Sequence, residues 1–238
     1  MIDLGSLGGT HGQPTWLNNR GQVVGYSDVA GDNSYHAFLW NRGVLTDLGT
    51  FGGNYSYAEW ISDAGDVSGE ATPPGDMAAP AALWSHGRIT NLGTLPGFDY
   101  ASAKSINSGQ QIVGLSCQLP CGDQTMFSAF LWENGGPMVA LDGLVENLSN
   151  LHLYWGTYIA ENGRIVAQAV DSSGNLRTVV LVPHGDCDSS CEERLAATNK
   201  QLAQRVSLST RQPAVHASDW MRSLPGTLRK GTLGSSLN

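Results

Sequence analysis

Charged side chains are scarce in this chain of 238 residues: Asp, Glu, Lys and Arg make up 14% of the sequence, against about 25% in an average soluble protein. Basic residues are the scarcer sign, with 13 Lys and Arg against 21 Asp and Glu, and the net charge is −8. This balance argues against a general nucleic-acid binder, which needs a basic face to displace counterions, and against an anionic membrane surface as partner. Long apolar runs are also missing, since no stretch approaches the roughly 20 apolar residues needed to span a bilayer.

Recognisable catalytic and export signals are missing too. The sequence has no G-x-S-x-G, no H-E-x-x-H, no phosphate-binding loop and no dinucleotide glycine fingerprint. No signal peptide precedes the first motif, so we expect that an export signal was removed or that the chain starts there naturally. The four cysteines form two CxxxC pairs, Cys117/Cys121 and Cys187/Cys191. Two short-range disulfides, typical of a secreted or periplasmic protein, are favoured over a four-thiolate zinc site.

Glycine, by contrast, is abundant at 30 residues, and much of it belongs to an internal repeat. The motif DLGSLGG at residues 3–9 recurs as DLGTFGG at 47–53 and as NLGTLPG at 91–97, at a spacing of 44 residues. Two further blocks, of which LNNRGQVVG and HAFLW are the first copies, keep their order between these motifs. Searching for such periods comes first because they indicate repeat architectures. The sequence divides into four repeats, at residues 1–45, 46–89, 90–138 and 139–185.

Each repeat predicts four short strands separated by glycine-containing turns. The successive strands are exemplified by residues 58–61, 22–26, 36–40 and 44–48. Four strands in about 45 residues match the blade of a β-propeller. The last repeat stops after its third strand, and residues 1–4 read as an unpaired fourth strand. We therefore expect an all-β, propeller-like ring of about four four-stranded blades, in which this N-terminal strand completes the last blade and removes a free sheet edge. A larger ring of two chains, or an open stack, is the alternative.

The last part of the chain belongs to no repeat. Residues 191–206 have the apolar spacing of a helix, and the segment from Ser207 onward is rich in Ser, Gly, Thr and Leu. We expect one repeat domain over residues 1–185 and a tail over residues 186–238 that contains a short C-terminal helix.

The repeat pattern, with its DLGT-x-GG turn, its GQVVG strand and its HAFLW strand, resembles that of the HAF-repeat proteins. These are predicted extracellular bacterial β-repeat proteins. The resemblance covers residues 1–184, and it is clear in the first three copies, whereas the fourth copy has lost the Gly-Gly turn and the His-Ala-Phe triplet. It implies a secreted β-repeat protein and supplies no catalytic motif.

Positions at which equivalent repeats differ are the candidates for function, because core positions should be alike in every copy. Aligning the first strands gives an aromatic set, Trp16, Trp60 and Tyr158, next to the charged residues Glu59 and Lys104. In a propeller these strands usually line the central channel. The set predicts an aromatic-walled ligand pocket that contains two charges. The alternative interpretation is that the tryptophans fill the core between blades.

A second set follows the Gly-Gly turn and consists of His11, Tyr55 and Asp99, with His152 as a poorly aligned fourth member. Tyr55 and Asp99 are further candidates for ligand binding. A histidine can act as a general base near neutral pH, so His11 and Glu59 are the catalytic candidates. The alternative is a solvated surface histidine.

A third set lies in the turns before the second strands: Asn18, Asp63, Asn107 and Glu161. Their side chains offer hard oxygen ligands of the kind that Ca²⁺ prefers. The alternative is ordinary Asn/Asp-Gly turn chemistry.

Taken together, these sets favour a Ca²⁺-assisted hydrolase of a small lactone, ester or phosphoester, with the metal stabilising the developing oxyanion. An extracellular carbohydrate-binding module and a non-catalytic scaffold are the alternatives. The expected partners are a small molecule or a carbohydrate, together with a second copy of the chain in a homodimer.

Overall fold

The structure is a computed structural model that describes residues 1–146, 148 and 150–183. The chain divides into two units, Met1–Asp186 and Cys187–Asn238, and the described residues all belong to the first. The helix expected at residues 191–206 and the pair Cys187/Cys191 lie outside the described residues. Within them, no helix is long and apolar enough to cross a membrane.

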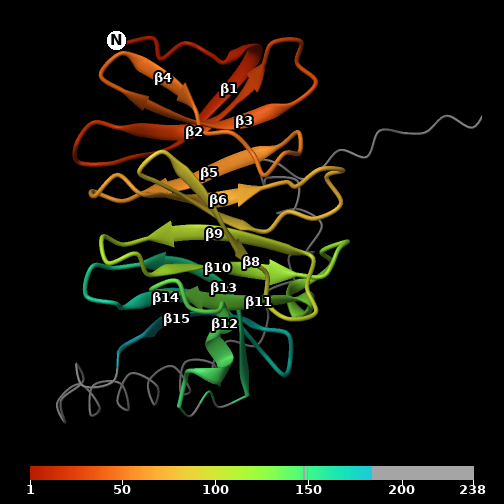
Figure 1. Cartoon of the computed structure of the whole chain (residues 1–238). Helices are drawn as coiled ribbons and strands as arrows, with labels where there is room; N and C mark the ends of the chain where they lie inside the picture. Colours follow the sequence, from red (N-terminus) through yellow and green to blue (C-terminus); the bar gives the residue numbers. More distant parts are fainter. Residues whose placement is uncertain (147, 149, 184–238) are drawn as a thin grey trace, which may run out of the picture. The chain divides into compact units, whose positions relative to one another are not determined.

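The described strands form four antiparallel sheets, which we name sheets A to D in chain order (Figure 1). Sheet A contains β1 (Gly8–Leu17), β2 (Val23–Val29), β3 (Tyr35–Asn41) and β4 (Val44–Asp47). Sheet B contains β5 (Ser56–Ile61), β6 (Val67–Ala71), β7 (Ala81–Ser85) and β8 (Arg88–Gly93). Sheet C contains β9 (Tyr100–Ile106), β10 (Ile112–Cys117), β11 (Phe127–Trp132) and β12 (Val139–Ala140). Sheet D contains β13 (Leu151–Ile159), β14 (Ile165–Asp171) and β15 (Leu176–Leu181).

The expected all-β fold is confirmed, with four strands in each of the first three sheets and three in the last. Two short 3-10 helices, η1 (Gln124–Met126) and η2 (Leu141–Gly143), lie beside β11 and β13. In sheets A and B the last strand carries or runs into the Asp-Leu-Gly or Asn-Leu-Gly motif. β4 therefore crosses the repeat boundary that the sequence places at residue 46.

Successive sheets pack face to face through the first strand of the later sheet. β5 packs on β2 and β3, β9 on β6 and β7, and β13 on β10 and β11. The cores between them combine small aliphatic side chains with a few aromatic ones, as in the cluster of Val24 and Ala37 from sheet A with Ile61, Val67 and Trp84 from sheet B. The inner strands are therefore buried on both faces, which explains why β10 is buried along its whole length.

Every first strand carries a β-bulge at the same place. In sheet B the pairing with β6 shifts between Ala58 and Trp60, which leaves Glu59 as the extra residue. The glycine opposite this bulge has no room for a side chain, because a Cβ on Gly69 would lie 1.9 Å from the carbonyl oxygen of Tyr57. A bulge redirects its extra side chain. The bulged residues of the four sheets are Thr15, Glu59, Lys104 and Thr157.

The glycine motif of the repeat forms the link between sheets. The backbone N–H of Gly49 donates to Asp47 Oδ1 at 2.7 Å, and Gly49 has a positive φ of 73° that favours glycine. The same bond recurs at the start of the chain, where the Gly5 N–H donates to Asp3 Oδ1 at 3.0 Å. Residues 3–5 therefore precede sheet A in the same turn that follows β4 in the link from sheet A to sheet B.

The strand expected at residues 1–4 is absent, and so is its pairing with the last sheet. Residues 1–6 form no strand, and Leu7 bridges to Val29 of sheet A. Among the described residues, none pairs with the outer edge of β15. The physical reason is local: the Asp3–Gly5 bond, and a second bond from the Gly8 N–H to Ser6 Oγ at 3.2 Å, hold the segment in turns.

Deleting residues 1–3 is accordingly expected to change the melting temperature by less than about 2 °C, because Ile2 is 72% exposed and surface changes usually cost under about 0.5 kcal/mol. Thermal melts of the two proteins, followed by circular dichroism, measure this difference. A drop of more than about 5 °C, the size expected for losing a buried strand, would instead support closure of the last sheet by the N-terminus.

Cys117 and Cys121 form a disulfide, as expected for this pair. The bridge joins the end of β10 to the loop that precedes η1, and the Cys117 side chain is fully buried.

Candidate functional site

The three aromatic residues of the first strands come together as one row. The rings of Trp16 and Trp60 stack with centroids 3.4 Å apart, and the Tyr158 ring lies 5.4 Å from that of Trp60. Sheet C contributes Ser105 at this position, and this small residue lets Trp60 reach across to Tyr158. Trp16 and Tyr158 are each 40% exposed. The rings thus pack mainly on one another, and the row is open to solvent at its two ends.

The two charged residues predicted for the same site also meet. Lys104 Nζ donates to Glu59 Oε1 in an ion pair that joins sheets B and C. Both side chains are mostly buried, at 15% and 19% exposed. They meet because each is the extra residue of a bulge, and the bulge turns both side chains into the space between the sheets.

Three residues that sequence comparison missed complete this group. Ser102 Oγ donates to Glu70 Oε2 at 2.5 Å and lies 3.4 Å from Glu59 Oε1. The hydroxyl of Tyr100 donates to the other oxygen of Glu70 at 3.2 Å. The two carboxylates therefore converge on one serine hydroxyl. We refer to Glu59, Glu70, Tyr100, Ser102 and Lys104 as the Glu59–Glu70 cluster.

The cluster perturbs the charges that it contains. Burial raises the pKa of Glu70 to about 7, although the Lys104 ammonium acts in the opposite direction. Burial lowers the pKa of Lys104, but the charges of Glu59 and Glu70 outweigh it, and the net effect is a raised pKa. The pKa of Tyr100 is raised by burial and by the nearby carboxylates. Near neutral pH the cluster thus holds one ionised lysine and a carboxyl group poised to gain or lose a proton.

Aromatic side chains border the cluster. Lys104 Nζ lies 5.6 Å from the centre of the Trp155 ring, within the range of a cation–π interaction. On the other side, Tyr57 pairs with Glu70 across the β5–β6 ladder, and its ring lies 4.7 Å from that of Tyr26. Burial and the charges of Glu59 and Glu70 raise the pKa of Tyr57. The cluster is a polar centre with aromatic walls.

Two members of the set after the Gly-Gly turn contact other aromatic side chains. His11 Nε2 lies 3.5 Å from the Tyr26 hydroxyl, at an exposed position, and the Tyr55 ring packs 4.9 Å from Tyr35. Strand pairing corrects the third member, because Tyr100, and not Asp99, occupies the position equivalent to Tyr55. The third repeat has one additional residue before its first strand, which the constant spacing of 44 residues concealed.

His152 has a structural role. Its Nδ1 lies 2.6 Å from Asp142 Oδ2, and its Nε2 lies 2.6 Å from the carbonyl oxygen of Phe127. Both ring nitrogens are engaged, so His152 ties β13 to η2 and β11.

The turn residues proposed as metal ligands form a hydrogen-bond ladder between sheets. Asn18 Nδ2 donates to the carbonyl oxygen of Ser62 at 2.9 Å, and Asn107 Nδ2 donates to that of Ala160 at 3.1 Å. The Oδ1 atom of each asparagine accepts two backbone N–H groups, which uses both of its lone pairs. These asparagines therefore do not fit a calcium site.

The two acidic residues of this set are engaged in the same way. Asp63 accepts from the side chain and backbone of Asn19, at 2.7 and 3.0 Å, and these bonds lower its pKa. Glu161 accepts from the backbone N–H of Ser108 at 3.0 Å. Across residues 1–146, 148 and 150–183, no group of three or more His, Cys, Asp or Glu side chains could hold a metal ion.

A signal for the missed residues was present in the sequence. The residue after the second-strand glycine differs between repeats: it is Tyr26, Glu70 and Leu115 in the first three, and Gln168 is its equivalent in the fourth. Comparing this position in the way that the first strands were compared would have identified Glu70.

Searches against protein-family models and against curated proteins find no match to this chain, so its function must be inferred from the geometry of this site.

Proposed function

We propose that this protein binds a carbohydrate at the Glu59–Glu70 cluster. The observation that supports this proposal is the convergence of two carboxylates on Ser102, beside a lysine that is paired with one of them. Solvent reaches the charged members, since Glu59, Glu70 and Lys104 each keep a small exposed fraction. Such a group of convergent polar atoms with aromatic neighbours is characteristic of small-molecule sites.

The chemistry of the cluster suits a ligand that is rich in hydroxyl groups. Sugar hydroxyls can donate to the oxygens of Glu59 and Glu70 and can accept from the Lys104 ammonium. The apolar face of a sugar ring packs well on an aromatic side chain, and Trp155 lies beside Lys104. A neutral apolar ligand would displace water from these charged groups without offering them a hydrogen bond, which is costly.

Hydrolysis of the bound sugar is a second candidate, and the pKa of Glu70 favours it. A carboxyl group with a pKa of about 7 can donate a proton to a leaving group near neutral pH. Glu59, held by Lys104, supplies a neighbouring carboxylate. Such a division of roles between two carboxyl groups is the usual arrangement for cleaving glycosidic bonds.

The Cys117–Cys121 disulfide supports the accompanying proposal that the protein is secreted or periplasmic.

Retention on immobilised neutral, amino-sugar and uronic-acid polysaccharides tests the proposal. The full chain should bind at least one of them, and Glu59→Gln and Trp155→Ala should each weaken binding about tenfold or more, a loss of about 1.4 kcal/mol. Released reducing ends, measured in the same samples, report turnover. Turnover that Glu70→Gln abolishes would identify a hydrolase.

Trp16→Ala is the matched control, because Trp16 belongs to the aromatic row but not to the cluster. It should leave sugar binding unchanged. Loss of binding in Trp16→Ala alone would place the ligand on the aromatic row and contradict the assignment to the cluster, whereas no retention on any polysaccharide would contradict carbohydrate binding altogether.

A further inference from the structure

One pair of apolar residues recurs in every sheet, and in sheets B, C and D the preceding sheet covers it. In sheet B it is the cross-strand pair Ile61 and Val67, each 1% exposed, which packs on Val24 and Ala37 of sheet A. The equivalent pairs are Ile106 with Ile112 in sheet C and Ile159 with Ile165 in sheet D, and all four side chains are at most 6% exposed. This position is therefore an interface between sheets wherever a sheet precedes it.

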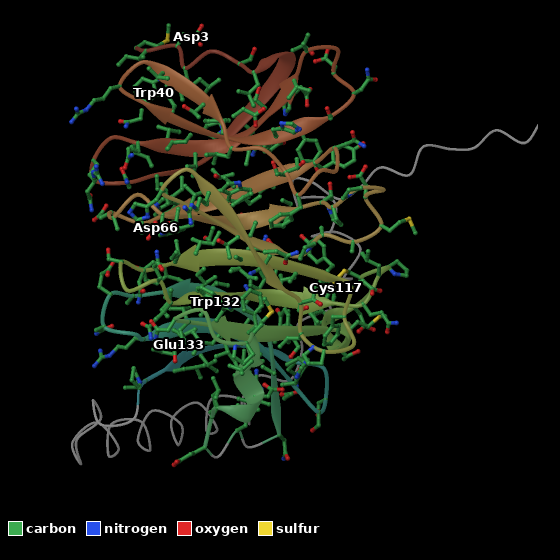
Figure 2. All side chains as sticks on the ribbon, in the orientation of Figure 1. Asp3, Trp40, Asp66, Cys117, Trp132 and Glu133 are labelled. Carbon is green, nitrogen blue, oxygen red and sulfur yellow. A yellow bond between two sulfur atoms is a disulfide. The ribbon has the colours of Figure 1, made fainter. Side chains whose placement is uncertain are left out.

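The same pair in sheet A has no preceding sheet. It consists of Leu17 and Val23, and Leu17 is 60% exposed. Together with Pro14, Thr15 and Trp16, these residues line a groove of about 350 Å³. Trp40 on β3, which Figure 2 labels together with Trp132, follows the same pattern. It is only partly buried, whereas its equivalents Trp84 and Trp132 are 4% and 7% exposed.

Within the described part of the chain, the far side of sheet D is exposed in a complementary way. Val180 pairs with Val166 across β14 and β15 and is 55% exposed. Its equivalent in sheet B, Leu83, is 4% exposed, because sheet C packs on it. Leu176, on the same face of β15 as Val180, is 52% exposed. Sheet D thus presents the kind of surface that sheets A, B and C each use to cover the sheet that follows.

We propose that a second copy of this chain completes both ends, with the outer face of sheet D in one copy packing on the outer face of sheet A in the next. The contact would repeat the packing that joins sheets A to B, B to C and C to D within the chain. It would also continue the aromatic row, since Tyr158 and Trp16 are the exposed ends of that row and would meet across the interface. The inference does not depend on carbohydrate binding at the Glu59–Glu70 cluster.

The interface is head to tail, because it joins two different faces. Such heterologous contacts either close into a ring or extend as a series. Two copies that close would form a ring of eight sheets. This arrangement would provide the closure that residues 1–4 do not provide within one chain.

Sedimentation velocity on the full chain, from low to high micromolar concentration, tests the proposal with two variants. Wild-type protein should associate, either to a dimer or to larger species that grow with concentration. Leu17→Glu on sheet A and Val180→Glu on sheet D should each remain monomeric. Both substituted side chains are more than half exposed, so each variant should fold, which circular dichroism verifies. The control is Val44→Glu, which should associate like wild type. Val44 is 62% exposed, and its equivalent Arg88 is exposed even in sheet B.

Mixing the two variants gives the sharpest outcome. Leu17→Glu keeps an intact sheet D face and Val180→Glu keeps an intact sheet A face, so an equimolar mixture should form a one-to-one dimer that neither variant forms alone. A wild-type chain that stays monomeric throughout the range would overturn the proposal and leave residues 187–238 or another molecule to cover these faces. Association that survives in Val180→Glu alone would also overturn it, because it would show that two sheet A faces pair with each other.

Discussion

Replacing Gly69 with alanine is expected to destabilise the protein by about 3 kcal/mol, near the upper end for overpacking a buried position. The new Cβ would lie 1.9 Å from the carbonyl oxygen of Tyr57 and 3.1 Å from the Cα of Ala58. Both atoms belong to the backbone of β5, so neither can move without displacing the bulge. The bulge in turn positions Glu59, and the substitution should therefore also weaken any binding at the Glu59–Glu70 cluster.

Denaturant unfolding at neutral pH measures the first effect. The matched control is Gly143→Ala, because a Cβ at Gly143 meets nothing within 4 Å and its φ is not positive. This control should unfold within about 0.5 kcal/mol of wild type. Equal stabilities of Gly69→Ala and Gly143→Ala would show that β5 and β6 are not as close as the structure has them.

Replacing Glu70 with glutamine is expected to remove a pH dependence of stability between about pH 5 and pH 8. The pKa of Glu70 rises from an ordinary 4.5 to about 7 in the folded protein, chiefly because burial disfavours the charged form. The folded protein then binds this proton more tightly than the unfolded chain does. The resulting stabilisation is fully present below pH 4.5 and is lost as pH rises through about 7.

The size of this effect follows from the pKa difference. At about 1.4 kcal/mol for each pKa unit, a rise from 4.5 to about 7 corresponds to roughly 3 kcal/mol. The pKa values of Asp63 and Asp76 are lowered instead, so the stabilisation that these two residues contribute is lost as pH falls. This loss occurs only in more acidic solution, since their ordinary pKa is 3.8. They do not interfere in the window in which Glu70 titrates.

Urea unfolding of wild type and Glu70→Gln at several pH values from about 5 to 8 measures the difference. Wild type should lose stability relative to the variant as pH rises, and Glu146→Gln, at an exposed position, should follow wild type. Parallel curves for wild type and Glu70→Gln would falsify the raised pKa, and with it the proposal that Glu70 could donate a proton near neutral pH.

Much of the fold follows from the repeat. The strands of each unit were predictable because glycine-containing turns separate short apolar runs in the same order in each repeat, and such turns favour hairpins between neighbouring strands. The turn at Asp47–Gly49 and the glycine opposite the bulge are local requirements, so they recur with the motif in the first three copies. The absence of a strand at residues 1–4 was missed, although the Asp3–Gly5 turn that prevents it has the same motif.

Some residues of the candidate site could be found from the sequence, and others only from the structure. Sequence comparison could group the aromatic residues Trp16, Trp60 and Tyr158, because equivalent positions lie side by side when similar sheets stack. Glu59 and Lys104 meet for the same reason. Glu70 and Ser102 escaped that comparison because they sit on different strands of different sheets and at non-equivalent positions. Only the approach of β6 to β9 brings their oxygens to 2.5 Å.

The sequence by itself thus determined the number of repeats, the strands within them and the residues that equivalence places side by side. The tertiary structure decided the rest: which carboxylates share a hydroxyl, which turn oxygens are already occupied, and which sheet faces remain uncovered. The physical reason is that turns and bulges depend on neighbours along the chain, whereas burial, pKa and the use of lone pairs depend on atoms that the packing of separate sheets brings together.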